Sequence, residues 1–240
     1  MTLTVKDPLG DHFKAFEAIE ERTIDSSYAA IRVDGRAFHT LTKSMEKPFD
    51  FRFVQAMNAA ARAAANAYHN VAFAYVQSDE ISFILYRGST GYPFNGRTQK
   101  LITLAASAAS AAFAVSLERV DLESPPIFDG RIISLDSAIE VENYLSWRRL
   151  DCMKNAVSSC CNALFTQEEL HGRTTRERQE MLQGTVFEHI DDGLFYGRFV
   201  CREVFEKTGP GGEIAQRHRW IVIPGDRKHA GSLIAGLPSV

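Results

Sequence analysis

The fold is decided by the stretch Tyr75-Val76-Gln77-Ser78-Asp79-Glu80-Ile81-Ser82-Phe83-Ile84-Leu85-Tyr86, in which two apolar segments flank two adjacent carboxylates. Apolar residues alternate with other residues on both sides of the acidic pair, which is the pattern of two half-buried strands joined by a turn. We therefore expect Asp79 and Glu80 at an edge of a sheet. Acidic residues are poor strand formers, and a tight hairpin favours Asn-Gly or Asp-Gly, so turn chemistry alone does not account for this pair.

A second apolar strand ends in a carboxylate upstream, where Val33 is followed by Asp34 and Gly35. Mg²⁺ is usually held by one or two carboxylates together with waters and substrate phosphates, so we predict that Asp34 and Asp79 meet at one cation site. A simple turn remains the alternative for Asp34, because Asp-Gly after a strand also forms turns. The small and turn-tolerant residues from Gly35 to Thr42 predict a cluster of backbone N–H groups suited to a triphosphate.

Helix and strand patterns follow these segments in a definite order. Alanine-rich helices are predicted over 51–69 and 98–118, and a further strand over 127–135. Together with the strand that ends at Asp34 and the acidic hairpin, the order is βαββαβ, which is the ferredoxin-like pattern of the α+β class. On such a sheet the end of the first strand lies beside the central hairpin, which would bring Asp34 close to Asp79.

The character of the chain changes after Leu135. We predict a palm-like catalytic domain over 1–135 and a C-terminal region over 136–240 that packs on it. The elements expected outside the βαββαβ unit are a helix over 11–22, helices over 136–147 with Asp136 as N-cap, 151–165 and 168–183 with Thr174 or Thr175 as cap, strands over 194–207 and 213–223 joined by a Gly/Pro turn, and a loose tail over 228–240.

The composition is that of a globular protein of 240 residues, with 45% hydrophobic and 24% charged residues and a formal net charge of −3. No apolar run reaches the roughly 18 to 20 residues that a membrane helix needs, so we expect a cytoplasmic protein without membrane contact. The four cysteines have no Cys-x-x-Cys spacing, which favours buried thiols over a zinc site. The charge neither indicates nor excludes nucleic-acid binding, because binding needs only a local basic face.

Several motifs, in this order, resemble the tRNA(His) guanylyltransferase family and its 3′–5′ polymerase-like relatives. They are Asp34-Gly35-Arg36-Ala37-Phe38-His39, Ser78-Asp79-Glu80-Ile81-Ser82-Phe83, Phe94-Asn95-Gly96-Arg97-Thr98-Gln99-Lys100-Leu101 and Tyr144-Leu145-Ser146-Trp147-Arg148. The resemblance spans roughly residues 13 to 165, and ordered motifs are far more specific than any one of them alone.

The resemblance implies a polymerase-like palm, two Mg²⁺ ions, ATP and GTP as nucleotides, tRNA as partner and a homotetramer. Members of the family activate the 5′-monophosphate of a tRNA with a nucleoside triphosphate, and the 3′-hydroxyl of an incoming GTP then attacks it. The implied catalytic residues are Asp34, Asp79 and Glu80, with Asp34, the carbonyl of Gly35, and Asp79 as metal ligands. The matching nucleotide-binding positions are Gly35, Arg36, Ala37, Phe38, His39, Lys47, Ser78, Arg97 and Lys100.

One segment departs from the family's pattern. Where typical members have a His-Ile-Asn-Asn-Leu-Tyr-Asn run after Ser-Trp-Arg, this chain has Met153-Lys154-Asn155-Ala156-Val157-Ser158-Ser159, which keeps only Asn155. The resemblance ties this segment to tRNA handling, so repair of broader RNA 5′ ends fits the chain at least as well as guanylylation of the histidine tRNA. The RNA-binding positions that we expect are Arg148, Arg149, Lys154 and Asn155.

Two other functions stay open at this point. A nucleotide cyclase or signalling synthase uses the same palm, because a hairpin with adjacent Asp and Glu also serves that chemistry. A non-catalytic RNA- or nucleotide-binding module is the second alternative. The carboxylates Asp34, Asp79 and Glu80 argue against it, because they would repel phosphate in the absence of metal.

Overall fold

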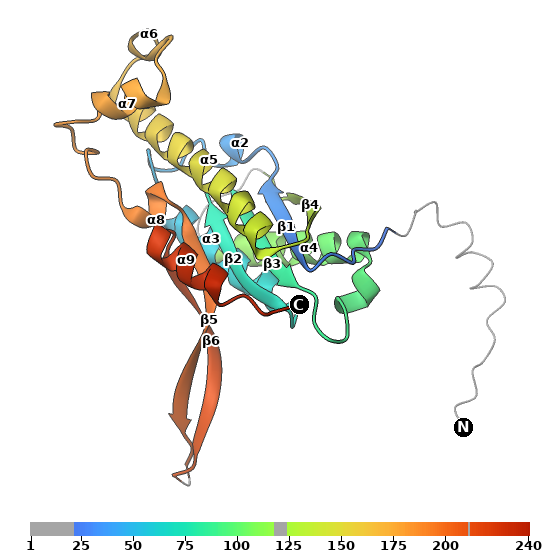
Figure 1. The fold of residues 1–240 in the computed structure, drawn as a ribbon. Coiled ribbons are helices and arrows are strands. Elements are labelled where there is room, and N and C mark those ends of the chain that lie inside the picture. The colour runs from blue at the N-terminus through green and yellow to red at the C-terminus, as the bar shows by residue number, and fades with distance from the viewer. Residues whose placement is uncertain (1–21, 118–123, 211) are drawn as a thin grey trace, which may run out of the picture.

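The computed structural model describes residues 22–117, 124–210 and 212–240 (Figure 1). The strands are β1 (Tyr28–Gly35), β2 (Val71–Gln77), β3 (Glu80–Tyr86), β4 (Phe128–Leu135), β5 (Arg198–Thr208) and β6 (Ile214–Pro224). The helices are α2 (Phe38–Leu41), α3 (Phe51–Ala65), the 3₁₀ turn η1 (Pro93–Gly96), α4 (Thr98–Ser116), α5 (Ala138–Leu164), α6 (Gln167–Leu170), α7 (Thr175–Met181), α8 (Asp192–Phe195) and α9 (Arg227–Ala235). The helix predicted over 11–22 lies, but for its last residue, outside the described residues.

The strands form one six-stranded sheet in the order β4-β1-β3-β2-β5-β6. Every neighbouring pair is antiparallel, so the chain has a mixed α/β fold built on an antiparallel sheet. The predicted strand over 127–135 and the helix over 98–118 are confirmed, with small shifts at their ends. The first strand lies directly beside the acidic hairpin, as the sequence predicted.

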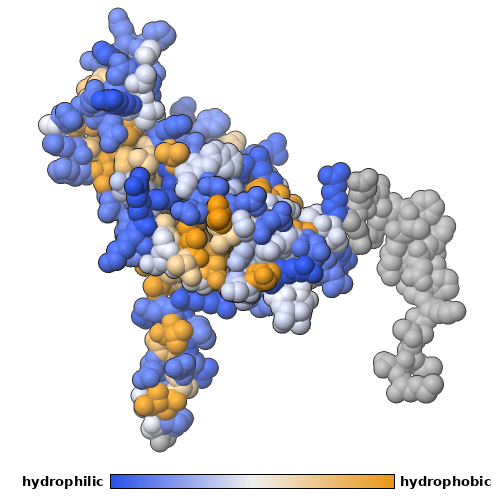
Figure 2. Space-filling model, in the orientation of Figure 1, coloured by the Kyte–Doolittle hydropathy of each residue, from blue (hydrophilic) through white to orange (hydrophobic). Residues whose placement is uncertain are grey.

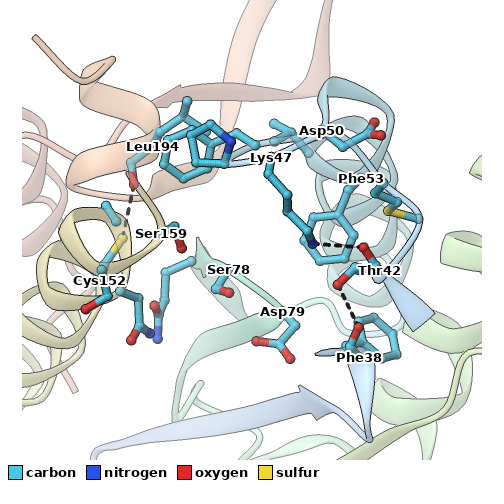
Figure 3. Close-up of a pocket in the computed structure, with 18 of the residues that line it drawn as sticks. Phe38, Thr42, Lys47, Asp50, Phe53, Ser78, Asp79, Cys152, Ser159 and Leu194 are labelled. Carbon is cyan, nitrogen blue, oxygen red and sulfur yellow. Dashed lines mark hydrogen bonds between the residues drawn. The ribbon is translucent and has the colours of Figure 1, made fainter. Parts of the chain in front are cut away.

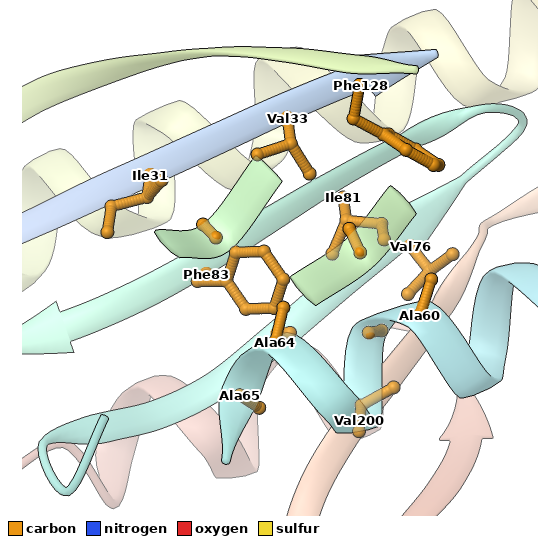
Figure 4. Packing of buried hydrophobic residues seen from close by; sticks show 14 of the residues in the cluster. Ile31, Val33, Ala60, Ala64, Ala65, Val76, Ile81, Phe83, Phe128 and Val200 are labelled. Atoms are coloured by element: carbon orange, nitrogen blue, oxygen red, sulfur yellow. The ribbon is translucent and has the colours of Figure 1, made fainter. Parts of the chain in front are cut away.

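One face of the sheet is covered by α3 and α4 (Figure 4). Strand residues such as Ile31, Val33 and Phe83 point into this layer, and Ala60 and Ala64 of α3 meet them. Because alanine carries only one side-chain carbon, the helices lie close to the sheet and to each other, as the alanine-rich patterns indicated. This layer holds the site end of β1 in place.

The opposite face is covered by α5 and α9, which pack on a second cluster of buried residues that includes Tyr28, Phe73 and Tyr75. The sequence predicted two helices with a break after Trp147, but α5 is one continuous helix of 27 residues. Its N-cap is Ser137, not Asp136, because the Ser137 hydroxyl accepts the N–H of Glu140. No helix in the described ranges is both long and apolar enough to cross a bilayer.

The far half of α5 projects beyond the sheet and carries α6 and α7 (Figure 1). The single helix predicted over 168–183 is wrong, because Gly172 adopts a positive φ of 72° between two short helices. Thr174 caps the second of them in a capping box with Glu177, which confirms one of the two predicted caps. A small apolar cluster around Cys160, Cys161 and the chain segments after α7 holds this end together.

The hairpin β5–β6 confirms the two predicted strands, and its outer half extends past the sheet (Figures 1 and 2). Only Arg198 to Cys201 pair with β2, so the outer residues contact each other across the hairpin and leave Val204 and Ile214 exposed. The predicted loose tail is wrong, because α9 forms there with Asp226 as its N-cap. All four cysteines are buried free thiols, as expected.

Candidate active site

The two predicted carboxylates come together where β1 ends beside the β2–β3 turn. Asp34 pairs with Glu80 in the register of β1 and β3, and the N–H of Gly35 donates to the carbonyl oxygen of Asp79 at 3.0 Å. The turn consists of Ser78, at a φ of 46°, and Asp79. It therefore lies one residue earlier than predicted, and Glu80 is the first residue of β3.

The carboxylate of Asp34 lies close enough to that of Asp79 to raise its pKa. Burial, and then the charge of Asp34, raises the pKa of Asp79 above its ordinary value. Burial, and then the charge of Asp129 on the neighbouring strand, raises the pKa of Asp34. Both shifts have the sign expected when anionic groups are crowded without a counter-cation.

The donor atoms here suit a hard cation. Among the described residues no group of three or more His, Cys, Asp and Glu side chains is arranged to hold a metal ion. The available donors are thus the carboxylates of Asp34 and Asp79 and nearby backbone oxygens such as the Gly35 carbonyl. Such a set leaves coordination positions for water and phosphate oxygens, which fits Mg²⁺ rather than a protein-enclosed zinc ion.

Glu80 belongs to a buried ion network under α5. Its Oε1 accepts from Nε of Arg148 at 2.8 Å, and its Oε2 lies 3.7 Å from Nε of Arg32. Nη2 of Arg148 also contacts Asp151 at 2.7 Å. Burial raises the pKa of Glu80, while Arg148 and Arg32 oppose that shift. Arg148, predicted to bind RNA, is therefore buried and engaged in tying α5 to the strand end.

The segment after β1 is shaped by one aromatic side chain. A Cβ atom on residue 35 would lie 2.4 Å from the ring of Phe38, so only glycine fits there. Phe38 itself is buried, with its ring 5.0 Å from the rings of both Phe113 and Phe128. This anchor turns the backbone at Ala37, which has a φ of 57°. The N–H groups of Thr40 and Leu41 donate to the carbonyl of Ala37, so only the first two N–H groups of α2 are left without an intrahelical acceptor. Arg36 is exposed, and its N–H donates to the carbonyl of Ile127.

A cavity of about 670 Å³ opens beside Asp79 (Figure 3). Ser78 and Asp79 lie between Lys47 on one wall and α5 on the other. Nζ of Lys47 donates to the carbonyl of Thr42 at 2.9 Å, which holds the amine at the cavity. The exposed ring of His39 also lines it, and its charge opposes the upward pKa shift of Asp79. The cavity thus places the side chains of Lys47 and His39 beside Asp79, one of the two aspartates of the site.

The α5 wall carries polar groups from the segment that departs from the family's pattern. Asn155, Ser158 and Ser159 of this segment line the cavity, as does Asn162 one turn further on, whereas Lys154 is exposed and does not line it. Beyond them lies Arg198, which the sequence did not single out. Its Nε donates to Oδ1 of Asn58 at 2.9 Å and its Nη1 to the carbonyl of Gly193 at 3.0 Å. No local pattern marks Arg198, because its partner Asn58 is 140 positions away.

The structure does not bring every predicted position to this cavity. Arg97 is the N-cap of α4 and Lys100 lies in its first turn, with its amine over the ring of Phe94. The other end of α4 carries Phe113, which packs on Phe38 at the site. Neither Arg97 nor Lys100 lines the cavity beside Asp79. Arg149, also predicted, lies with its guanidinium 5.5 Å over the ring of Tyr196.

Metal-assisted phosphoryl transfer requires carboxylates that bind metal ions and polar groups that bind phosphates. The two carboxylates on adjacent strand ends, beside a cavity with basic and amide groups, provide both. The class of protein that this fold and site define is a nucleotidyltransferase. Residues 10–136 match the protein family described as tRNAHis guanylyltransferase. The chain therefore belongs to the tRNAHis guanylyltransferase family, as its motifs predicted.

Individual relatives agree with this assignment. The chain is 32% identical over 191 residues to the tRNA(His) guanylyltransferase of Schizosaccharomyces pombe, covering 77% of this chain and 71% of that protein. It is 31% identical to a probable tRNA(His) guanylyltransferase of Drosophila melanogaster, where the match spans 65% of the longer relative.

Solved structures extend the likeness over nearly the whole chain. The structure of a bacterial tRNA(His) guanylyltransferase-like protein in complex with ATP superposes with a TM-score of 0.80 at 27% identity, covering 96% of this chain and 99% of that one. A structure of such a bacterial protein in complex with GTP superposes with a TM-score of 0.73 at 26% identity, covering 95% and 98%.

Proposed function

We propose that this chain adds guanylyl nucleotides to the 5′ end of a tRNA, in the 3′–5′ direction, after activating the 5′-phosphate with ATP or GTP. The observation that carries the proposal is the meeting of Asp34 and Asp79 beside the cavity, since Gly35 N–H donates to the Asp79 carbonyl at 3.0 Å and the charge of Asp34 raises the pKa of Asp79. Family membership supports the same reaction. The existence of complexes of related proteins with ATP and GTP supports the choice of nucleotides.

We assign the four strands in the order β4-β1-β3-β2, with α3 and α4 on one face, to a ferredoxin-like palm that ends at Leu135. Residues 136–240 then form a C-terminal region that lengthens the sheet through β5 and covers the other face with α5. The proposal includes two Mg²⁺ ions, a cytoplasmic location and a homotetramer, as the resemblance implied. Light scattering of the purified protein tests the tetramer.

In the proposed mechanism Asp34, Asp79 and the carbonyl of Gly35 would hold the two ions. When bound, these ions would neutralise phosphate charge and align the attacking and leaving oxygens. The N–H groups of Phe38 and His39 at the start of α2, together with Lys47 and Ser78, bind the triphosphate in the cavity, and the His39 ring adds a further donor. Glu80 positions the strand end through its ion pair with Arg148, so the spacing of the two aspartates is maintained.

The cavity wall supports a substrate range wider than the histidine tRNA. The side chains of Asn155, Ser158 and Ser159 stand on α5 where typical family members have His-Ile-Asn-Asn-Leu-Tyr-Asn. Because the segment tied to selection of that tRNA is replaced, we propose repair of 5′-truncated tRNAs in general. Comparing 5′-truncated histidine tRNA with another truncated tRNA tests this, since equal rates are expected and strict preference for the histidine tRNA would contradict it.

The test of the reaction itself uses a tRNA transcript lacking its first nucleotide, labelled GTP, ATP and Mg²⁺. The wild-type protein should lengthen the RNA by one labelled nucleotide at its 5′ end, and Asp79→Asn should abolish the product. Asp25→Asn is the matched control, because Asp25 precedes β1, at the other end of that strand, with a side chain that is 81% exposed. Failure of the wild-type protein to extend any truncated tRNA, or cyclic nucleotide formed from GTP without RNA, would overturn the proposal.

A further inference from the structure

The proposed function leaves one motif residue without a role. Trp147 belongs to the Tyr-Leu-Ser-Trp-Arg motif, yet its side chain does not enter the core and is 53% exposed. It lies on α5, the helix that crosses the sheet (Figure 1), and its ring contacts Tyr144 edge to face at 5.9 Å between centroids. A large aromatic side chain that stays half exposed next to buried charged residues is a candidate for contact with a ligand.

Two nearly buried guanidinium groups support the indole from the protein side. The Cζ atoms of Arg148 and Arg32 lie 4.2 and 5.4 Å from the centroid of the Trp147 ring. The side chains of Arg148 and Arg32 are only 7% and 13% exposed, so the indole contacts buried cations while about half of it stays open to solvent. Both cations also contact Glu80, so the ring has a definite place relative to the strand end.

This surface lies next to Asp34 but outside the cavity. Arg32 and Asp34 are two residues apart on β1 and therefore lie on the same face of the sheet, the face that α5 covers. In the pairing with β4, Arg32 lies opposite Arg131 and Asp34 opposite Asp129. Arg131 is 55% exposed and forms an ion pair at 3.4 Å with Asp129, which is exposed to a similar degree. The described residues that line the cavity include Asp79 but not Trp147, Arg32 or Arg131. The carboxylate pair therefore separates two places where a substrate could lie.

We propose that Trp147 is the stacking platform for the terminal base of the RNA substrate, with Arg131 beside it to contact a phosphate. The inference rests on the proposed function, because a reaction that joins a nucleotide to an RNA end needs both at the carboxylate pair. The cavity holds the nucleotide, so the RNA end must approach from the side of β1 and β4. Aromatic side chains bind unpaired bases by stacking. The cation–π contacts with the two guanidinium groups hold the indole of Trp147 in one orientation.

Binding is tested first, without chemistry. The chain has two tryptophans, so Trp220→Phe leaves Trp147 as the only indole. Titration of this variant with a tRNA transcript lacking its 5′ nucleotide, in the absence of GTP and ATP, should quench the Trp147 emission. Unchanged emission at saturating RNA would overturn the inference. Because the readout needs no catalysis, quenching in a protein that adds no nucleotide would refute the proposed function and leave the platform standing.

Kinetics then separate the two substrates. Trp147→Ala should raise KM for the RNA by roughly ten-fold or more and leave KM for GTP unchanged, and Trp147→Phe should restore part of the loss. The matched control is Ile139→Ala, on the same helix and 69% exposed, which should change neither constant. An unchanged KM for RNA in Trp147→Ala would overturn the inference. A change in oligomeric state of Trp147→Ala would also overturn it, because the indole would then face a second copy of the chain.

Discussion

The buried pair of Glu80 and Arg148 provides a prediction whose size follows from the structure. Both residues are 6% exposed and their charged atoms lie 2.8 Å apart. Removing one partner of such a pair leaves an uncompensated buried charge, which costs about 3–5 kcal/mol. Arg32, 3.7 Å from the other carboxylate oxygen, keeps part of the compensation in Arg148→Met. We therefore expect a loss near the lower limit, about 3 kcal/mol, and a melting temperature lower by about 6–12 °C.

The pH dependence of this loss has a definite sign. Burial holds the pKa of Glu80 above its ordinary value of 4.5, and Arg148 opposes that shift. Without Arg148 the folded-state pKa rises further above the unfolded-state value. The folded variant then binds a proton more readily than the unfolded chain, so its stability falls as pH rises through this interval. The difference in the free energy of unfolding between wild type and Arg148→Met should be largest at neutral pH and should shrink as Glu80 becomes protonated.

Urea denaturation of four proteins is the assay: wild type, Arg148→Met, Glu80→Gln and the double variant. The double variant should be more stable than the sum of the single losses predicts, by about 2 kcal/mol, because neither Glu80 nor Arg148 is then left charged opposite a missing partner. Arg176→Met is the matched control, since Arg176 is 90% exposed in its pair with Glu180 and should change stability by no more than about 0.5 kcal/mol. A loss below about 1 kcal/mol for Arg148→Met, additive single losses or a pH-independent difference would refute the reasoning.

Three further predictions concern the same end of the sheet. Gly35→Ala should destabilise the protein by about 1–3 kcal/mol in a thermal melt, because the added Cβ would lie 2.4 Å from the Phe38 ring, while Gly231→Ala, with no atom within 4 Å, should be neutral or slightly stabilising; equal melting temperatures would contradict this. Phe113→Ala should cost about 3–5 kcal/mol in urea denaturation because its fully buried ring supports Phe38, and a loss below about 1 kcal/mol would show that the aromatic cluster contributes little. Asp79→Asn should raise the melting temperature of the metal-free protein at neutral pH, because folding raises the Asp79 pKa above 3.8 and ionised Asp79 therefore opposes folding. This gain should vanish below pH 3.8, and a lower melting temperature of the variant at neutral pH would contradict the prediction.

The strand patterns around Asp34 and Asp79 were sufficient to predict the central arrangement. Period-two alternation marks a buried strand locally, and the order of helices and strands then brings the two strand ends together. The buried position of Glu80 was harder to predict, because in the sequence Glu80 and Asp79 look like two equivalent carboxylates. The difference arises from Arg148, which is 68 positions away and neutralises Glu80 inside the protein.

The errors share the same physical origin. The sequence from Arg148 to Leu150 looked like a break between helices, but α5 is continuous there and Arg148 pairs with Glu80 of β3, 68 positions away. The tail after Lys228 looked featureless, yet α9 packs on the sheet and the hydroxyl of Tyr28 donates to the carbonyl of Pro238. In each case the deciding contact is distant in sequence.

The most direct measurement of the account is a crystal grown with GTP and Mn²⁺, with anomalous scattering recorded at the manganese edge. We predict an anomalous peak between the carboxylates of Asp34 and Asp79, with the triphosphate of GTP in the cavity beside Lys47. GTP bound in the cavity with no manganese peak between these two carboxylates would contradict the account.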